Sequence, residues 1–300
     1  MTAQAAPAGS DAPTAVMAAV RPVVVVGAGT MGNGIAQVFA MSGRPVLLLE
    51  PMEPALKKGL ATIEKSLGKL AEKGVITADQ RSEAFGRIAT REEGFPLSEC
   101  SIAVEAVPEK IEIKRAVHQM LDQKLPPDAI LATNTSSISV TELAAITKRP
   151  TRFIGMHFMN PVPVMQLVEV VRGLETSPET VAETVALAKA LGKTPVVVED
   201  RPGFVSNRVL LPMINEAAFA LMEGVADREA IDTVMKLGMN HPLGPLALAD
   251  LIGVDVCLDI LEVLHRGLGE DKYRPCPLLR TMVAAGRLGR KTGRGFYEYR

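Results

Sequence analysis

The hydrophobic and polar positions of the chain follow two patterns, and the change comes near residue 200. Before it, short runs of Val, Ile and Leu alternate with stretches in which apolar residues recur every three to four positions. The runs are typical of strands buried on both faces of a parallel sheet, and the stretches of amphipathic helices. The alternation predicts an α/β fold with a Rossmann-type, doubly wound, mostly parallel sheet.

The individual elements of this first region can be placed from the same pattern. Helices are expected at 35–43, 54–72, 109–121, 142–147 and 179–191. Strands are expected at 23–26, 45–50, 101–107, 129–133, 153–158, 165–171 and 195–199.

Beyond residue 200 the pattern is helical, at 202–224, 227–237, 245–267 and 276–286, with a possible strand only at the final YEY. Pro212 lies inside the first of these helices and could kink it. We therefore expect two domains, an α/β domain at 21–200 and a second, all-α C-terminal domain at 201–300. Residues 1–20 are rich in Ala, Pro, Ser and Thr, lack Lys and Arg, and are expected to form a disordered tail rather than a targeting signal.

Composition excludes several classes of function. A formal net charge of −1 gives no electrostatic reason to expect a nucleic-acid partner. No apolar run reaches the roughly 18–20 residues that span a bilayer, so no membrane association is expected. Cys100, Cys257 and Cys276 are odd in number and far apart, which favours idle thiols in a reducing cytoplasm over disulfides or a metal site.

A glycine-rich turn follows the first strand and opens the first helix. Gly27, Gly29 and Gly32 have the G-x-G-x-x-G spacing, with Thr30 and Met31 between the last two. In this context the first glycine permits a tight turn, the second lets the backbone approach a pyrophosphate, and the third lets helix and strand pack closely. The segment predicts a dinucleotide site with the phosphates at the helix N-terminus.

Glu50 ends the second strand, eighteen residues after Gly32. A carboxylate there can accept hydrogen bonds from both ribose hydroxyls and would repel a 2′-phosphate. No Arg or Lys occurs in the next six residues, so NAD is expected as the cofactor in preference to NADP.

Two residues suggest acid–base chemistry. His157 lies at the end of an apolar strand, just before the prolines of FMNPVP. In open α/β sheets, ligands bind at the strand ends. Glu169 is a lone carboxylate within LVEVV, where an unpaired charge is costly, and a nearby imidazole would serve as its partner. Exposure of Glu169 on an edge strand is the alternative. His118, His241 and His265 have the contexts of ordinary surface or packing residues.

Seven segments, in order over about 280 residues, resemble the short-chain L-3-hydroxyacyl-CoA dehydrogenase family, which includes bacterial 3-hydroxybutyryl-CoA dehydrogenases. They are VVVVGAGTMGNGIA, VEAVPE, TNTSS, FIGMHFMNPVPVMQLVEVV, DRPGFVSNRV, PLGPLALADLIGVDV and GRKTGRGFYEY. Several are specific to that family, so the resemblance is much stronger than the glycine turn alone.

The resemblance implies particular roles. It makes His157 the catalytic base and Glu169 its partner, and it places Ser136 at the substrate hydroxyl and Asn207 near the reacting oxygen. It also implies a short-chain (S)-3-hydroxyacyl-CoA substrate, such as 3-hydroxybutyryl-CoA, and a homodimer formed through the C-terminal domain. The positions that it assigns to the cofactor or the cleft are Glu109, Lys114, Asn134 and Asn160.

Two questions stay open from the sequence. The lysines of 54–73 could bind the phosphates of coenzyme A or simply form a solvated helix face. A gulonate-type dehydrogenase acting on a free hydroxy acid shares the HxxNP and Asn features and stays an alternative. The 3-hydroxyisobutyrate and 6-phosphogluconate dehydrogenases need a catalytic Lys on the first helix of the second domain, and the helix expected at 202–224 has no Lys. A non-enzymatic NAD-binding protein is disfavoured because the four catalytic positions are all present.

Overall fold

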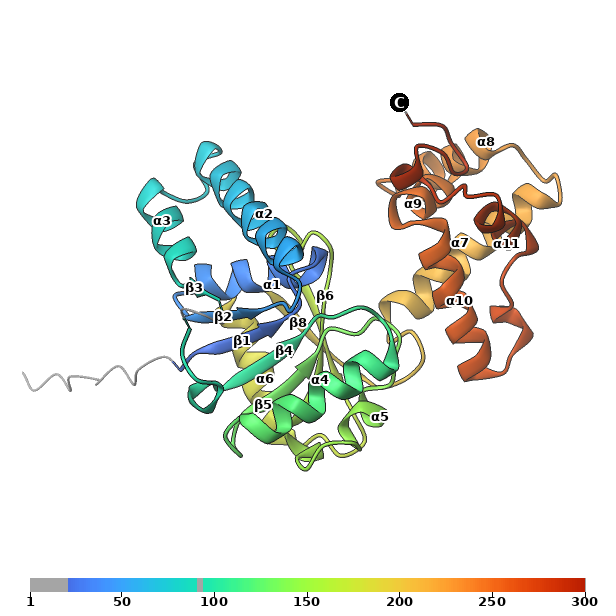
Figure 1. Ribbon diagram of the computed structural model, residues 1–300. Coiled ribbons are helices and arrows are strands. Elements are labelled where there is room, and N and C mark those ends of the chain that lie inside the picture. Colours follow the sequence, from blue (N-terminus) through green and yellow to red (C-terminus); the bar gives the residue numbers. More distant parts are fainter. Residues whose placement is uncertain (1–20, 91–93, 300) are drawn as a thin grey trace, which may run out of the picture.

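The computed structural model describes residues 21–90 and 94–299, so the tail predicted at 1–20 lies outside the described residues. Figure 1 shows an α/β body and a helical body, joined where α7 (Ser206–Met222) leaves the sheet. This arrangement confirms the predicted fold class.

One eight-stranded sheet forms the α/β body, in the order β3-β2-β1-β4-β5-β6-β7-β8. Every neighbouring pair is parallel except β6 with β7, which is antiparallel. The strands are β1 (Val23–Val26), β2 (Val46–Leu49), β3 (Ile88–Ala89), β4 (Ile102–Glu105), β5 (Ile130–Thr133), β6 (Phe153–Phe158), β7 (Leu167–Arg172) and β8 (Thr194–Glu199).

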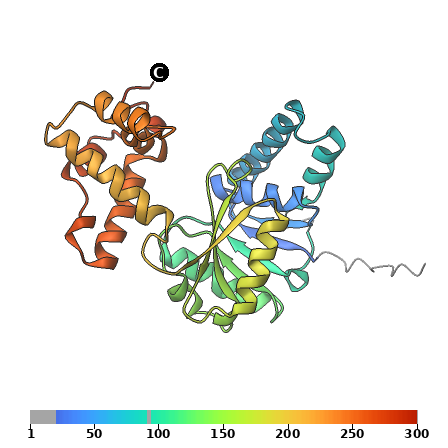
Figure 2. The ribbon, with the colours of Figure 1, turned by 180° about the vertical axis from the view of Figure 1, so that it is seen from behind.

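Two hydrophobic cores lie on opposite faces of the sheet. Val23 and Val25 contribute to one core, and Val24 and Val26 to the other, because successive strand residues point to opposite faces. Figure 2 shows α6 on one face, and Figure 1 shows α4 on the other. The first core is covered by α1 (Thr30–Met41), α2 (Glu53–Glu72), α3 (Ala78–Gly86) and α6 (Pro178–Ala190), the second by α4 (Ile111–Lys124) and α5 (Val140–Ala144).

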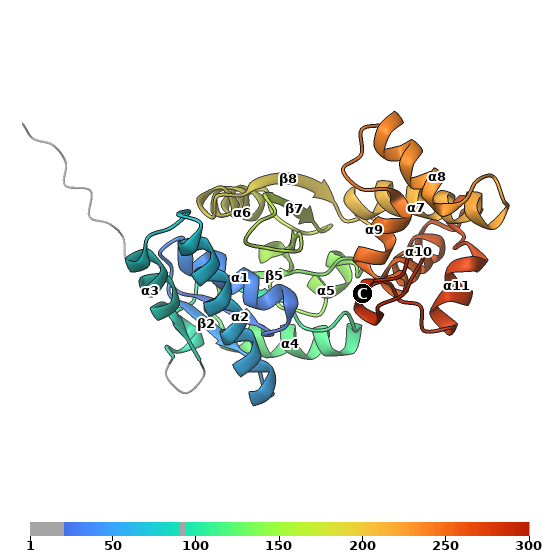
Figure 3. The same cartoon turned by 90° about the horizontal axis from the view of Figure 1, so that it is seen from above.

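The helical body has a core of its own, built from side chains between Leu211 and Phe296. Figure 3 shows it at the opposite end of the molecule from α2 and α3. Its helices after α7 are α8 (Arg228–Thr233), α9 (Pro245–Ile252), α10 (Val254–Leu268) and α11 (Pro277–Ala284), with a π-helical turn at Val234–Gly238.

Several predicted elements need correction. The helix expected at 245–267 is two helices, because Gly253 adopts φ 112° and breaks the hydrogen-bond ladder. The helix expected at 142–147 starts earlier, at Val140, since the Ser139 side chain caps its N-terminus. The possible C-terminal strand is reduced to isolated bridges at Arg294. Helix α7 continues through Pro212 as predicted, but it begins at Ser206 rather than at 202.

Two further observations bear on the sequence predictions. The three thiols are free and buried, and burial raises the pKa of Cys100 to about 11, which leaves it protonated and unreactive. Within residues 21–90 and 94–299, no helix has the length and apolar character required to cross a membrane.

Candidate active site

His157 and Glu169 lie side by side at the antiparallel junction of the sheet. They are directly opposite residues of β6 and β7, and the β pairing brings their side chains to the same face. His157 Nδ1 lies 2.8 Å from Glu169 Oε2, and both residues are buried, with 6% and 2% of their surface exposed. The solvent-facing alternative for Glu169 is therefore wrong.

Glu169 also accepts hydrogen bonds from the start of α7. Its Oε1 receives the backbone N–H groups of Val205 at 3.1 Å and Ser206 at 2.9 Å, and its Oε2 receives the Ser206 hydroxyl at 2.8 Å. Burial alone would raise the pKa of Glu169, but the hydrogen bonds from His157 and Ser206 outweigh it and hold the pKa below its usual value. An ionised Glu169 accepts from His157 Nδ1–H, which leaves the lone pair of the imidazole on Nε2.

Ser136 and Asn207 connect the two bodies beside this pair. Ser136 lies in the loop after β5, and the side-chain amide of Asn207 in α7 donates to the Ser136 carbonyl at 3.1 Å. Asn134, in the same loop, accepts the Phe158 N–H at 2.9 Å, which ties the end of β5 to the end of β6. The structure thus brings Ser136, Asn134 and Asn207 to the strand ends near His157.

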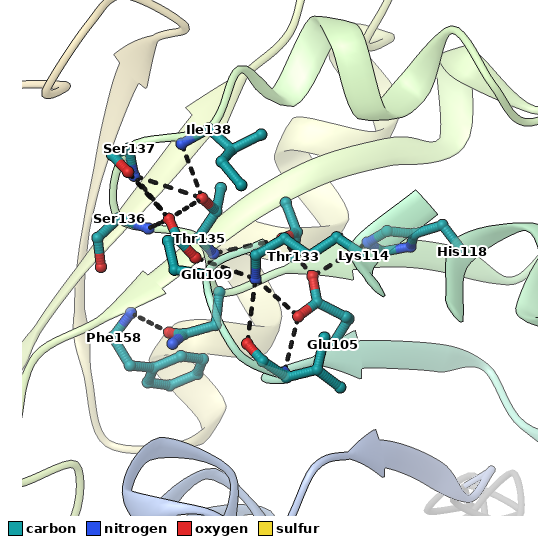
Figure 4. A network of polar contacts seen from close by, with 12 residues as sticks. Glu105, Glu109, Lys114, His118, Thr133, Thr135, Ser136, Ser137, Ile138 and Phe158 are labelled. Carbon is teal, nitrogen blue, oxygen red and sulfur yellow. Dashed lines mark hydrogen bonds and ion pairs between the residues drawn. The ribbon is translucent and has the colours of Figure 1, made fainter. Parts of the chain in front are cut away.

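Glu109 organises the loop that carries Ser136. It accepts the backbone N–H of Ser136 at 2.9 Å and that of Ser137 at 3.0 Å, along with the hydroxyls of Thr135 and Ser137 (Figure 4). Hydrogen bonds from several donors to one carboxylate fix the backbone of a loop. Glu109 therefore fixes the position of Ser136 through its backbone.

Lys114 lies beneath that loop, with only 1% of its side chain exposed. Its Nζ is 2.8 Å from Glu105 Oε1 and 3.2 Å from Glu109 Oε2 (Figure 4). Because two carboxylates enclose the ammonium, Lys114 does not contact the cleft itself. It acts there only by holding Glu109 in place.

The glycine turn has the space that a pyrophosphate requires. Gly27 adopts φ 103°, and a Cβ on Gly32 would lie 1.8 Å from the Gly27 carbonyl oxygen. A Cβ on Gly29, in contrast, would meet no protein atom within 4 Å. Protein atoms thus close the turn at Gly27 and Gly32 and leave it open at Gly29. There α1 begins, with Thr30 and Met31 as its first residues.

Glu50 is held beside this turn. Its Oε2 accepts the Ala28 N–H and its Oε1 the Met52 N–H, each at 3.1 Å. An apolar hollow of about 410 Å³ adjoins Glu50 and is lined by residues that include Leu49, Phe95 and Leu97. A carboxylate next to an apolar hollow suits the ribose and adenine of a dinucleotide.

A second cleft, of about 440 Å³, extends from the glycine turn to α2. Gly29 and Thr30 line one side, Lys58 and Ser66 of α2 another, and Asn160 closes it from the loop after β6. The loop that follows His157 therefore places the Asn160 amide side chain at the cleft.

Comparison with known proteins agrees with this geometry. The protein-family model for the 3-hydroxyacyl-CoA dehydrogenase NAD binding domain matches residues 22–201 of the sequence. The family model for the C-terminal domain matches residues 203–299. The chain belongs to the 3-hydroxyacyl-CoA dehydrogenase family. Its cofactor is NAD.

Relatives cover nearly the whole chain of this dehydrogenase. It is 57% identical over 275 residues to a probable 3-hydroxybutyryl-CoA dehydrogenase of Deinococcus radiodurans, covering 92% of this chain and 99% of that protein. It is 40% identical to the human mitochondrial hydroxyacyl-coenzyme A dehydrogenase, covering 94% and 92%. The crystal structure of (S)-3-hydroxybutyryl-CoA dehydrogenase from Ralstonia eutropha superposes with a TM-score of 0.90 at 51% identity, covering 94% and 99%.

One buried residue of this dehydrogenase, Glu105, was missed by sequence reasoning. Glu105 accepts the Thr133 hydroxyl at 2.7 Å, contacts His118 Nε2 at 3.2 Å and binds Lys114. Burial would raise the pKa of Glu105, but His118 and Lys114 lower it to about 2. Burial lowers the pKa of His118, which is therefore neutral. Glu105 could have been found, since it is a lone carboxylate in a buried run, like Glu169.

Proposed function

We propose that this protein catalyses the NAD-dependent oxidation of the 3-hydroxyl group of short-chain (S)-3-hydroxyacyl-CoA, converting 3-hydroxybutyryl-CoA to acetoacetyl-CoA, and the reverse reaction. The observation that carries the proposal is the buried His157–Glu169 pair at the strand ends, on the same sheet as a glycine turn suited to NAD. Three named relatives at 57%, 55% and 52% identity are 3-hydroxybutyryl-CoA dehydrogenases or probable ones, which supports the substrate class.

The proton chemistry belongs to His157. Its Nε2 takes the proton of the substrate hydroxyl, while Glu169 holds the ring in the required tautomer and stabilises the imidazolium that forms. In the reverse direction, protonated His157 donates to the ketone oxygen and returns the proton. NAD, when bound, supplies a ring that accepts the hydride from C3.

The remaining site residues position the reactants. Ser136 and Asn207, joined by a hydrogen bond, orient the hydroxyl or the thioester carbonyl. The residues proposed to bind the cofactor or line its cleft are Gly27, Gly29, Thr30, Met31, Gly32, Glu50, Glu109, Asn134 and Asn160, with Lys114 acting through Glu109.

The cleft between the glycine turn and α2 is the proposed path for the coenzyme A group. Lys58 and Ser66 line it and offer a cation and a hydroxyl to phosphate or amide groups. Lys57, on the same helix, instead pairs with Glu53 at 2.5 Å. Among the lysines of 54–73, the structure thus favours Lys58 for contact with the substrate.

The two bodies are proposed as a dinucleotide-binding domain at 21–200 and a helical substrate and dimerisation domain at 201–300, which their separate cores support. Large apolar side chains on the helical domain are exposed, including Val209 (69%), Val225 (74%) and Leu237 (81%). Exposed apolar surface of this kind favours a homodimer through that domain. Three buried free thiols are consistent with the cytoplasm as its location.

Steady-state kinetics test the proposal directly. Reduction of acetoacetyl-CoA and longer 3-ketoacyl-CoA thioesters is followed at 340 nm with NADH and with NADPH, and oxidation of free gulonate is assayed in parallel with NAD. We expect the largest kcat/KM for acetoacetyl-CoA with NADH. A greater kcat/KM for gulonate, or no turnover of any thioester, would contradict the proposal.

A further inference from the structure

A single carboxylate oxygen of Glu169 serves two side chains. His157 Nδ1 and the Ser206 hydroxyl both lie 2.8 Å from Oε2, whereas Oε1 is occupied by two backbone N–H groups. Ser206 is the first residue of α7 and lies one position before Asn207. The Ser206 hydroxyl therefore binds the same oxygen that orients the His157 imidazole.

We propose that Ser206 is a positioning residue that sets how strongly Glu169 holds His157, and thereby the pH range in which His157 works as a base. The inference rests on the proposed function, because it assigns Ser206 a part in the same proton transfer. Among the described residues, the Ser206 side chain forms no hydrogen bond to the imidazole or to the glycine turn.

The physical reason is competition for charge. A hydroxyl that donates to a carboxylate withdraws part of its negative charge from the other donor on the same oxygen. Without the Ser206 hydroxyl, more of the negative charge of Glu169 Oε2 acts on the imidazole, and the imidazolium form of His157 is stabilised. Glu169 is the charged side chain recorded within ion-pair distance of His157 in the described part of the chain. The Phe204 ring also packs against His157, with 5.7 Å between the ring centroids.

Ser206→Ala removes this hydroxyl without removing the helix cap. The backbone N–H groups of Val205 and Ser206 still donate to Glu169 Oε1, so the start of α7 stays attached to β7. Ser206→Thr restores the hydroxyl and serves as the conservative variant. Ser177→Ala is the matched control, because it removes a hydroxyl from the N-terminus of α6 that caps Thr180 N–H instead.

The readout is the pH dependence of kcat/KM for 3-hydroxybutyryl-CoA oxidation. We expect the acid limb of Ser206→Ala to move up by about half a pH unit, which lowers kcat/KM about threefold on that limb and little at high pH. Ser206→Thr and Ser177→Ala should keep the limb of the parent enzyme. A uniform loss of activity at all pH values, with the limb unmoved, would show a merely structural role and overturn the inference.

A second measurement separates this inference from the proposed function. Imidazole ¹⁵N NMR follows the titration of His157 in the enzyme without substrate, assigned by comparison with His157→Gln. A higher titration midpoint in Ser206→Ala than in Ser206→Thr supports the role of Ser206 whatever the substrate is. Equal midpoints refute it, even if the parent enzyme reduces acetoacetyl-CoA.

Discussion

His157 does its chemistry with one nitrogen because its other nitrogen is bound to Glu169. Glutamine at this position preserves a polar side chain of similar reach but cannot take up a proton. We expect His157→Gln to lower kcat by about 10²–10⁴-fold, the range usual for loss of a general base. Stopped-flow turnover of 3-hydroxybutyryl-CoA measures the loss.

The same variant should bind NADH with nearly unchanged affinity by fluorescence titration, because no hydrogen bond within residues 21–90 and 94–299 joins His157 to the glycine turn or to Glu50. If the variant turned over substrate at close to the parent rate, another residue would have to be the base.

Residue types in context predicted part of this site. Glu169 was found because a charge inside an apolar run needs a partner, and the opposing register of β6 and β7 supplies His157. The sharing of Glu169 with Ser206 was not predictable, because it depends on how α7 leaves the sheet after Phe204, which adopts φ 50°. Long-range placement of this kind carries no local sequence signal.

At the scale of elements, the β1–α1 turn distinguishes two glycines with different constraints. In Gly32→Ala the new Cβ collides with the Gly27 carbonyl, so we expect the melting temperature to fall by several degrees. In Gly29→Ala the Cβ enters open space, and the fold should melt within about 2 °C of the parent. Differential scanning fluorimetry measures both.

NADH affinity, unlike melting temperature, should be affected in Gly29→Ala. Gly29→Ala is expected to weaken NADH binding by about tenfold or more, measured by fluorescence, because its methyl group occupies space left for the pyrophosphate. Parent-like NADH affinity in Gly29→Ala would mean that the phosphates bind elsewhere.

The β4–α4 network predicts a pH dependence of stability. The pKa of Glu105 is about 2 in the folded chain and has its ordinary value near 4.5 in the unfolded chain. Its stabilising contribution is therefore complete above about pH 4.5 and is lost as the pH falls towards 2. We expect Glu105→Gln to reduce the free energy of unfolding by about 3 kcal/mol at pH 7, since Lys114 loses a buried partner.

Urea unfolding across pH 2.5–7 measures this difference, with Glu112→Gln on the exposed side of α4 as the control. The gap between parent and Glu105→Gln should narrow below pH 4.5, and Glu112→Gln should follow the parent. A gap that stays constant with pH would mean that folding does not change the pKa of Glu105.

Elements with strong periodicity were predicted well, and those without it were not. The buried strands and α2 lie close to their expected bounds. Helix α3 was missed because its sequence buries only Ala84, and β3 because a two-residue edge strand has no period to detect. The division between α9 and α10 depends on the positive φ of Gly253, which a continuous apolar pattern conceals.

At the scale of the whole molecule, exposed apolar side chains on the helical domain predict its association. We expect the parent protein to elute with the mass of two chains in size-exclusion chromatography with light scattering. Leu237→Asp places a charge on that surface and should shift the mass towards one chain. Leu174→Asp, at an equally exposed leucine of the α/β domain, should leave the mass of two chains. A parent protein with the mass of one chain would exclude the dimer.

The polypeptide passes from the sheet to the helical domain through residues 200–206, and Glu169 holds the end of that passage by three hydrogen bonds. The same carboxylate holds His157, so the start of the helical domain and the catalytic base share one anchor. A rotation of that domain against the sheet would therefore move the imidazole as well.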